Sequence, residues 1–132
     1  MNESPEVRCL IITSIFPPMK GGSAVVYENL CRYAPKGSAF VLTCWRHYVT
    51  GKNIDNWTEL DKKAQYPINR IELLRPLSQH SKSRFHSLWL LITNDFPLNI
   101  KILYQASQVI RANKINVICI GELVSGSWLG LV

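Results

Sequence analysis

The stretch Val-Arg-Cys-Leu-Ile-Ile-Thr-Ser-Ile at residues 7–15, followed by Phe-Pro-Pro-Met-Lys-Gly-Gly-Ser at residues 16–23, decides the fold. Its first part is an almost continuous apolar run, which is typical of a strand buried on both faces of a parallel sheet. The two prolines prevent a strand or helix from continuing. The two glycines permit positive φ angles and let a ligand approach the backbone closely. We therefore expect a buried strand that ends in a turn.

The next residues complete a βαβ unit. Val26, Leu30 and Tyr33 recur at helical spacing and predict an amphipathic helix over residues 24–34, for which Ser23 has the residue type of an N-cap. The sequence Ala-Phe-Val-Leu-Thr-Cys at residues 39–44 predicts a second buried strand. A strand, turn, helix and strand in this order are right-handed in nearly all proteins and imply a parallel sheet.

The rest of the chain continues the alternation. Residues 98–112 place Ile102, Ala106, Val109 and Ile110 at the spacing of a helix packed on one side. The other predicted elements are a weak helical turn at 57–64, a strand at 69–74, a helix at 84–92, a strand at 117–120 and a helix from Ser125 onward. This order predicts an α/β fold with a Rossmann-like, doubly wound, mostly parallel sheet.

Composition and charge narrow the class of protein. At 132 residues, with 47% hydrophobic and 18% charged residues, the chain has the size and balance of one globular domain. Its net charge of +6 favours anionic partners, or is simply that of a basic soluble surface. The basic residues are scattered, so we expect no nucleic acid as partner.

The four cysteines and the N-terminus point to a cytoplasmic protein. No Cys-x-x-Cys pair or zinc-like histidine spacing is present, so we expect reduced core thiols and no metal. Residues 1–8 lack the pattern of a signal peptide, and no apolar stretch approaches the length of a membrane span.

Ligands of open parallel sheets bind outside the carboxyl ends of the strands, which here are residues 14–23, 44–50 and 121–127. In the first of these, Gly21-Gly22-Ser23 precedes a helix whose N-terminal N–H groups can receive a phosphate or carboxylate, and Lys20 adds a positive charge. Neither the dinucleotide-binding fingerprint nor a Walker A loop is present. The other interpretation of the glycine pair is a plain turn.

Together with the residues that precede it, this loop has a resemblance to a known family. Ile11-Ile12-Thr13-Ser14-Ile15-Phe16-Pro17-Pro18 followed by Gly21-Gly22 resembles the opening of GT-B glycosyltransferases of the retaining group 1 (family 4-like). In the same way, residues 116–122 (Asn-Val-Ile-Cys-Ile-Gly-Glu) look like the strand that these enzymes write as Asp-Val-Ile-His-x-His. Cys119 and Gly121 depart from that pattern, because related enzymes often place histidines there.

The resemblance implies that residues 1–132 are one partial, acceptor-side, N-terminal domain of an enzyme that transfers a sugar from a nucleotide-sugar donor to a sugar or lipid-linked acceptor. Lys20, Gly21, Gly22 and Ser23 would face the donor diphosphate. The chain ends inside an apolar segment, Gly-Leu-Val, which predicts a truncated fold without the C-terminal donor-binding domain. We therefore expect no transferase activity from these residues alone, and no cofactor. A bare cleft face could drive formation of a homodimer.

Other positions have both a functional and a plainer interpretation. The acceptor-side candidates are His47, Glu122 and Ser125, with a solvated loop or turn as the alternative. Residues 75–91 combine basic and apolar side chains, which suits either a core helix or contact with the inner face of a membrane. The alternative function for the whole chain is a stand-alone, flavodoxin-like nucleotide- or phosphate-binding module.

Overall fold

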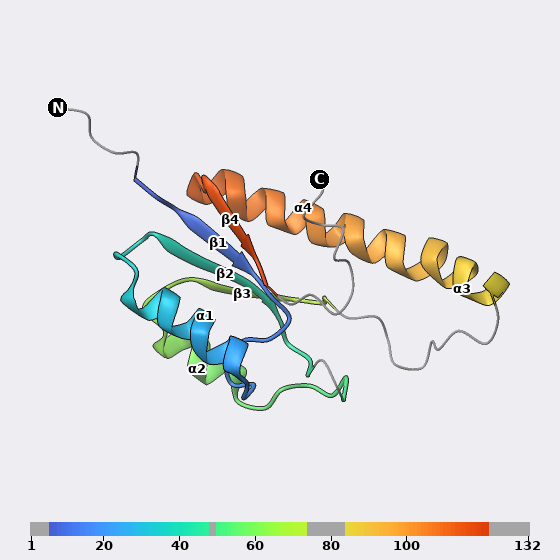
Figure 1. Cartoon of the computed structure of the whole chain (residues 1–132), viewed down its shortest axis with the longest axis horizontal. Coiled ribbons are helices and arrows are strands. Elements are labelled where there is room, and N and C mark those ends of the chain that lie inside the picture. Colours follow the sequence, from blue (N-terminus) through green and yellow to red (C-terminus); the bar gives the residue numbers. More distant parts are fainter. Residues whose placement is uncertain (1–5, 48–49, 74–83, 122–132) are drawn as a thin grey trace.

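The computed structural model describes residues 6–47, 50–73 and 84–121 of the chain. These residues form a four-stranded, all-parallel sheet in the order β3-β2-β1-β4, with helices on both of its faces (Figure 1). The predicted α/β fold with a Rossmann-like, doubly wound sheet is confirmed. The elements are β1 (Cys9–Ile12), α1 (Gly22–Tyr33), β2 (Ala39–Cys44), α2 (Trp57–Lys63), β3 (Ile68–Ile71), α3 (Arg84–Leu90), the π-helix η1 (Leu91–Asp95), α4 (Phe96–Asn113) and β4 (Val117–Ile120).

The strands begin and end close to the predicted residues. β2 and β4 have the predicted bounds. β1 is shorter than the predicted 7–15, because the backbone N–H of Ile15 bonds back to the hydroxyl of Thr13 at 3.2 Å and so turns the chain out of the sheet. β3 ends at Ile71, before the predicted end at residue 74. Residue 74 and the helix predicted from Ser125 onward lie outside the described residues.

The face of the sheet under α4 has an aliphatic core. Leu10 and Ile12 of β1 and Phe40 and Leu42 of β2 pack with Ala106 of α4, and all five are buried. Val109 and Ile110 pack against the same cluster, and Ile102 is buried nearby. The predicted inward face of this helix is therefore confirmed.

On the opposite face, α1 turns a different side to the sheet from the one predicted. Val26, Leu30 and Tyr33 are exposed, whereas Ala24 and Cys31 are buried. Cys31 packs with Ile11 and Val41 in the second core cluster. The small side chains of Ala24 and Cys31 let the helix come close to the sheet, and Val26, Leu30 and Tyr33 point away from it.

The predicted helices 84–92 and 98–112 are joined in the structure. α3, η1 and α4 follow one another without a gap and form one long rod that covers the sheet with its C-terminal part only (Figure 1). Pro97 lies in the first turn of α4, where its missing N–H is tolerated because the preceding turn is the wider π-helix. Within η1 the hydroxyl of Thr93 donates to the carbonyl of Trp89 at 2.8 Å.

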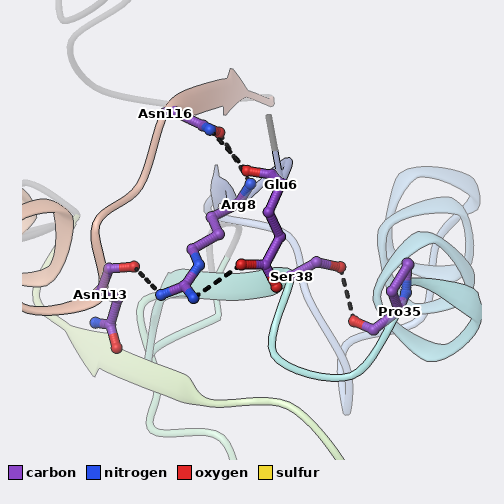
Figure 2. A network of polar contacts seen from close by, with 6 residues as sticks. All are labelled: Glu6, Arg8, Pro35, Ser38, Asn113 and Asn116. Carbon is purple, nitrogen blue, oxygen red and sulfur yellow. Dashed lines mark hydrogen bonds and ion pairs between the residues drawn. The ribbon is translucent and has the colours of Figure 1, made fainter. Parts of the chain in front are cut away.

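A polar network fixes the amino ends of β1 and β4 (Figure 2). The guanidinium of Arg8 donates to the carbonyl of Asn113 at 3.2 Å and pairs with the carboxylate of Glu6 at 3.0 Å. The side chain of Asn116 accepts from the N–H of Arg8 and donates to the carbonyl of Glu6. This network lies at the end of the sheet opposite to the ligand-binding edge, and we assign it a structural role.

Within the ranges that the structure describes, no helix combines the length and apolarity needed to cross a bilayer.

Candidate functional site

The strand order fixes where a ligand site belongs. β1 is connected through α1 to β2 on one side, while its neighbour on the other side, β4, comes from the far end of the chain. Strand order therefore reverses between β1 and β4, and the crevice at their carboxyl ends is the usual ligand position in such sheets. The N–H of Gly121 bonds to the carbonyl of Ile12 at 2.8 Å, so both strands reach this edge together.

The loop after β1 is held by two buried side chains on opposite faces of the sheet. Phe16 packs in the α1-side core and meets the ring of Tyr66 edge-on, with ring centroids 6.3 Å apart. Met19 packs on the other side with Cys44, Leu73 and Ile102 of the α4 layer. Because its base is fixed on both sides, the loop carries residues 20–22 outward to the surface.

Arg70 of β3 adds a polar link to this loop. Its side chain is 1% exposed, and it binds both carboxylate oxygens of Asp61 at 2.7 and 2.8 Å. The same guanidinium donates to the carbonyls of Cys44 at 3.0 Å and Pro17 at 2.5 Å. One buried cation therefore joins β3, α2, the end of β2 and the proline-glycine loop. The sequence analysis missed it, because no local pattern indicates that an isolated arginine is buried.

The exposed tip of the loop contains the residues predicted to face a diphosphate. Lys20, Gly21 and Gly22 are exposed and Ser23 is half-buried. The N-cap of α1 is Gly21, and not Ser23, which lies in the first turn of the helix. A glycine cap offers no side-chain acceptor, and the first turn carries no acidic residue. The positive end of the helix dipole therefore lies beside the exposed residues 20–22, with no acidic side chain in the first turn to balance it.

The fold does not require glycine at positions 21 and 22. Neither residue lies in the left-handed region that favours glycine, contrary to the freedom that the sequence suggested. Gly21 has φ 167°, an extended conformation open to any residue. A Cβ at Gly22 would meet nothing within 4 Å, and one at Gly21 would meet only a methyl of Ile15 at 3.9 Å. The absence of side chains here leaves the helix N-terminus open to a ligand.

Gly121 at the end of β4 differs, because a side chain there would collide with a neighbour. A Cβ at this position would lie 2.6 Å from the hydroxyl oxygen of Tyr27, a residue of α1. The ring of Tyr27 therefore lies directly against the backbone at the β1–β4 switch point. Tyr27 is a site residue that the sequence analysis missed, because the predicted inward face of α1 was one residue out of phase.

The acceptor-side candidates are only partly described. His47 is half-buried in the turn after β2, where its N–H donates to the carbonyl of Lys52 at 2.8 Å and its carbonyl accepts from Gly51 at 2.7 Å. Its Nδ1 accepts a long bond of 3.5 Å from the N–H of Thr50. These bonds shape the turn itself. Glu122 and Ser125 lie outside the described residues.

The thiol next to the site is not a nucleophile. Burial raises the pKa of Cys44, whose thiol donates to the carbonyls of Ser14 at 3.3 Å and Arg46 at 3.0 Å. A thiol that stays protonated and hydrogen-bonded is unreactive. The described part of this edge therefore presents the exposed Lys20, Gly21 and Gly22 beside a helix N-terminus, and its one thiol is not activated.

Comparison of the chain with family models, curated proteins and solved structures found no match.

Proposed function

We propose that this chain is the acceptor-side, N-terminal domain of a GT-B glycosyltransferase of the retaining group 1 type, which transfers a sugar from a nucleotide-sugar donor. One observation carries the proposal: Gly21 and Gly22 lie exposed at the N-terminus of α1, beside the switch point, where neither packing nor backbone geometry needs glycine. A ligand that lies directly on the backbone would need it. The resemblance of residues 11–22 to the opening of these enzymes names that ligand as a diphosphate.

In this proposal the loop stabilises the leaving diphosphate. The N–H groups of the first turn of α1 and the ammonium group of Lys20 would meet the charge that develops as the sugar departs. They cost little reorganisation, because Phe16, Met19 and Arg70 already fix the loop. The nucleotide and the sugar would be held by a donor-binding domain, so residues 1–132 alone would bind an anion but transfer nothing.

The proposal includes a location and a partner. The enzyme would work in the cytoplasm, peripheral to the inner face of a membrane, on a sugar or lipid-linked acceptor. A basic chain with a net charge of +6 suits both a diphosphate donor and an anionic membrane face.

The binding step can be tested on the 132-residue chain. Titration of the ¹⁵N-labelled protein with inorganic pyrophosphate should shift the amide resonances of residues 20–23 more than any others. The double variant Gly21→Ala/Gly22→Ala should weaken this binding at least tenfold. Its free energy of unfolding should change by no more than about 1 kcal/mol, because the new methyl at residue 22 meets nothing and the one at residue 21 only makes an ordinary contact with Ile15 at 3.9 Å.

A pair of lysine variants controls for nonspecific charge effects. Lys20→Ala should weaken pyrophosphate binding, whereas Lys36→Ala, which removes the same charge from the exposed turn before β2, should not. Equal losses in both variants, or shifts spread over the basic surface, would show that the loop is no anion site and would remove the main support for the proposal.

The alternative, a stand-alone flavodoxin-like module, has one observation against its fold. Flavodoxin-like sheets have the order 2-1-3-4-5, with the third strand beside the first, whereas here β4 lies beside β1 and β3 beside β2. A parallel titration with FMN separates the two functions. Tight FMN binding by the chain alone would favour the alternative.

A second test concerns the gene. The proposal expects the reading frame that encodes these residues to include another Rossmann-like domain. A reading frame without such a domain would contradict the transferase proposal, even if the loop binds pyrophosphate.

A further inference from the structure

A cavity lies behind the glycine loop, between α1 and α2, which cover the same face of the sheet (Figure 1). Its volume is about 310 Å³, within the range of small-molecule sites in proteins. Its lining includes Phe16 and Pro17, which belong to the base of the loop, and Asp61, the partner of Arg70. Because Arg70 also donates to the carbonyl of Pro17, an occupant of the cavity would contact groups that fix the loop.

A second cavity adjoins the first. The two share Arg32, Gln65 and Tyr66 in their linings, and the second has a volume of about 530 Å³ and reaches the turn at residues 35–37. We call the two cavities together the α1–α2 groove. The described lining of the groove includes none of residues 20–23, so the groove is a different place from the N-terminus of α1.

The end of the groove behind the loop is aromatic and apolar. The rings of Phe16 and Tyr66 meet edge-on there, with Leu60 and Ile68 beside them. Burial raises the pKa of Tyr66 to about 12, so its hydroxyl stays a hydrogen-bond donor at neutral pH. No hydrogen bond joins this hydroxyl to another residue in the part of the chain that the structure describes. A planar ring would find apolar contact and a free donor at this end.

The charges of the groove favour an anion. Each acid on its lining is already paired with an arginine, at 2.6 and 2.7 Å respectively: Glu28 with Arg32, and Asp61 with Arg70. Lys63 in the first cavity and Lys36 in the second have no ion-pair partner among the described residues. The uncompensated charge of the groove is therefore positive, which attracts a negatively charged occupant.

We propose that the α1–α2 groove binds a small aromatic anion, a ring with a carboxylate or phosphate group, and that this ligand strengthens diphosphate binding by the glycine loop. The ring lies against Phe16 and Tyr66, and the anionic group lies toward Lys63. An occupant behind Phe16 restricts the loop, and a restricted loop loses less freedom when a diphosphate binds to it. The strengthening rests on the proposed function, whereas the binding in the groove does not.

Titration of the ¹⁵N-labelled chain tests the binding, with benzoate in one series and phenyl phosphate in another. Both probes should shift the amide resonances of residues 28–32 and 63–66 more than those of residues 20–23. Inorganic phosphate should bind in the groove roughly tenfold more weakly, because it has no ring to bury. The tighter of the two aromatic probes identifies the anionic group that the groove prefers.

Two pairs of variants test the position of the ligand. Lys63→Ala should weaken benzoate binding about threefold, whereas Lys62→Ala, on the same helix but outside the lining, should not. Ala64→Trp fills the cavity and should abolish binding, whereas Ala112→Trp on the exposed surface of α4 should leave it unchanged. Circular dichroism checks that each variant is folded. If Ala64→Trp does not fold, the two lysine variants decide.

The coupling is measured through pyrophosphate. With benzoate at saturation, the affinity of the loop for pyrophosphate should rise about fivefold. Competition between the two anions for the loop would lower this affinity, so a rise separates coupling from competition. An unchanged or lower affinity would overturn the coupling.

Three results would overturn the binding: no shift of the groove residues with either aromatic probe, equal losses in Lys63→Ala and Lys62→Ala, or inorganic phosphate binding as tightly as benzoate. The proposed function fails separately. If benzoate binds in the groove but pyrophosphate does not bind to the loop, the groove is a site and the diphosphate proposal is wrong.

Discussion

α1 and α4 cover opposite faces of the same sheet, and they use different kinds of side chain to do so. α4 packs aliphatic residues such as Ile102 and Val109 into two core clusters. α1 presents Ala24, Cys31 and Tyr27 to the sheet, and its larger aliphatic residues face outward. The α4 layer is thus held by the amount of apolar surface it buries. The α1 layer is held by close approach.

Close approach has requirements that aliphatic packing does not have. The ring of Tyr27 can lie where it does because residue 121 has no side chain. The loop that leads into α1 is held by the hydrogen bond from Arg70 to Pro17, and α2 beside it by the pair of Arg70 with Asp61. We therefore expect the α1 side to depend on a few specific contacts, and the α4 side on volume.

Removal of Arg70 should have the largest effect. Arg70→Met leaves the carboxylate of Asp61 without its partner and should lower the free energy of unfolding by about 3–5 kcal/mol, measured by urea denaturation. Arg32→Met breaks the exposed pair with Glu28 and should cost no more than about 0.5 kcal/mol. The double variant Arg70→Met/Asp61→Leu should recover part of the loss. Similar stabilities for Arg70→Met and Arg32→Met would contradict the role given to Arg70.

On the α4 layer, two isoleucines two residues apart should differ strongly. Ile102 is 1% exposed and Ile100 is 51% exposed. Ile102→Ala should lower the free energy of unfolding by about 2–5 kcal/mol through the lost burial and the cavity that remains. Ile100→Ala should change it by about 0.5 kcal/mol or less. Equal losses, measured by urea denaturation, would mean that Ile100 is not exposed in solution.

Two glycines near the same edge of the sheet should differ in how much stability is lost when each is replaced by alanine. Gly121→Ala forces Tyr27 to move and should cost about 1–3 kcal/mol, whereas Gly22→Ala places a methyl in open space and should cost nothing. Thermal unfolding of the two variants gives the comparison. In the background Tyr27→Ala, the cost of Gly121→Ala should largely vanish, since the two sites are in contact. Additive effects would show that the tyrosine does not lie against Gly121.

The different packing of α1 and α4 explains how far the sequence predicted the fold. The apolar runs of β2 and β4 predicted those strands to the residue. β2 is buried throughout, whereas Val117, Ile118 and Ile120 of β4 are exposed, so a short apolar run marks a strand without fixing its burial. Val26, Leu30 and Tyr33 predicted the helix α1 correctly but its inward face wrongly. The helix has apolar residues on two sides, and periodicity does not tell which side has the small side chains that fit the sheet.

The candidate site was likewise predicted only in part, because only some of its residues form a local pattern in the sequence. The glycine loop is visible as a local pattern, and the structure puts it at the switch point. Arg70 and Tyr27 act through contacts across 53 residues or more, from Arg70 to Pro17 and from Tyr27 to Gly121. Contacts over such separations depend on the assembled sheet, and no neighbouring residue in the chain signals them.

The thiol on the inner side of α1 should make stability depend on alkaline pH. Burial raises the pKa of Cys31 from 9.0 to about 12. Between these values the thiol ionises in the unfolded chain while it stays protonated in the folded one. The unfolded state then binds fewer protons, so stability should fall as the pH rises from 9 to 12. Cys31→Ala should flatten this decline in urea denaturation measured across that range. An unchanged slope would mean that Cys31 is not buried against the sheet.

The smallest effect is expected on the outer side of α1. Leu30 is 54% exposed, so Leu30→Ser should change the free energy of unfolding by about 0.5 kcal/mol or less. Ala24→Leu, on the inner side of the same helix, adds volume where the helix meets the sheet closely and should cost about 1–3 kcal/mol. Urea denaturation of both variants tests the orientation of α1 directly. If Leu30→Ser were the more damaging of the two, the inner face would be the one that periodicity suggested, and close approach would not be what holds α1 to the sheet.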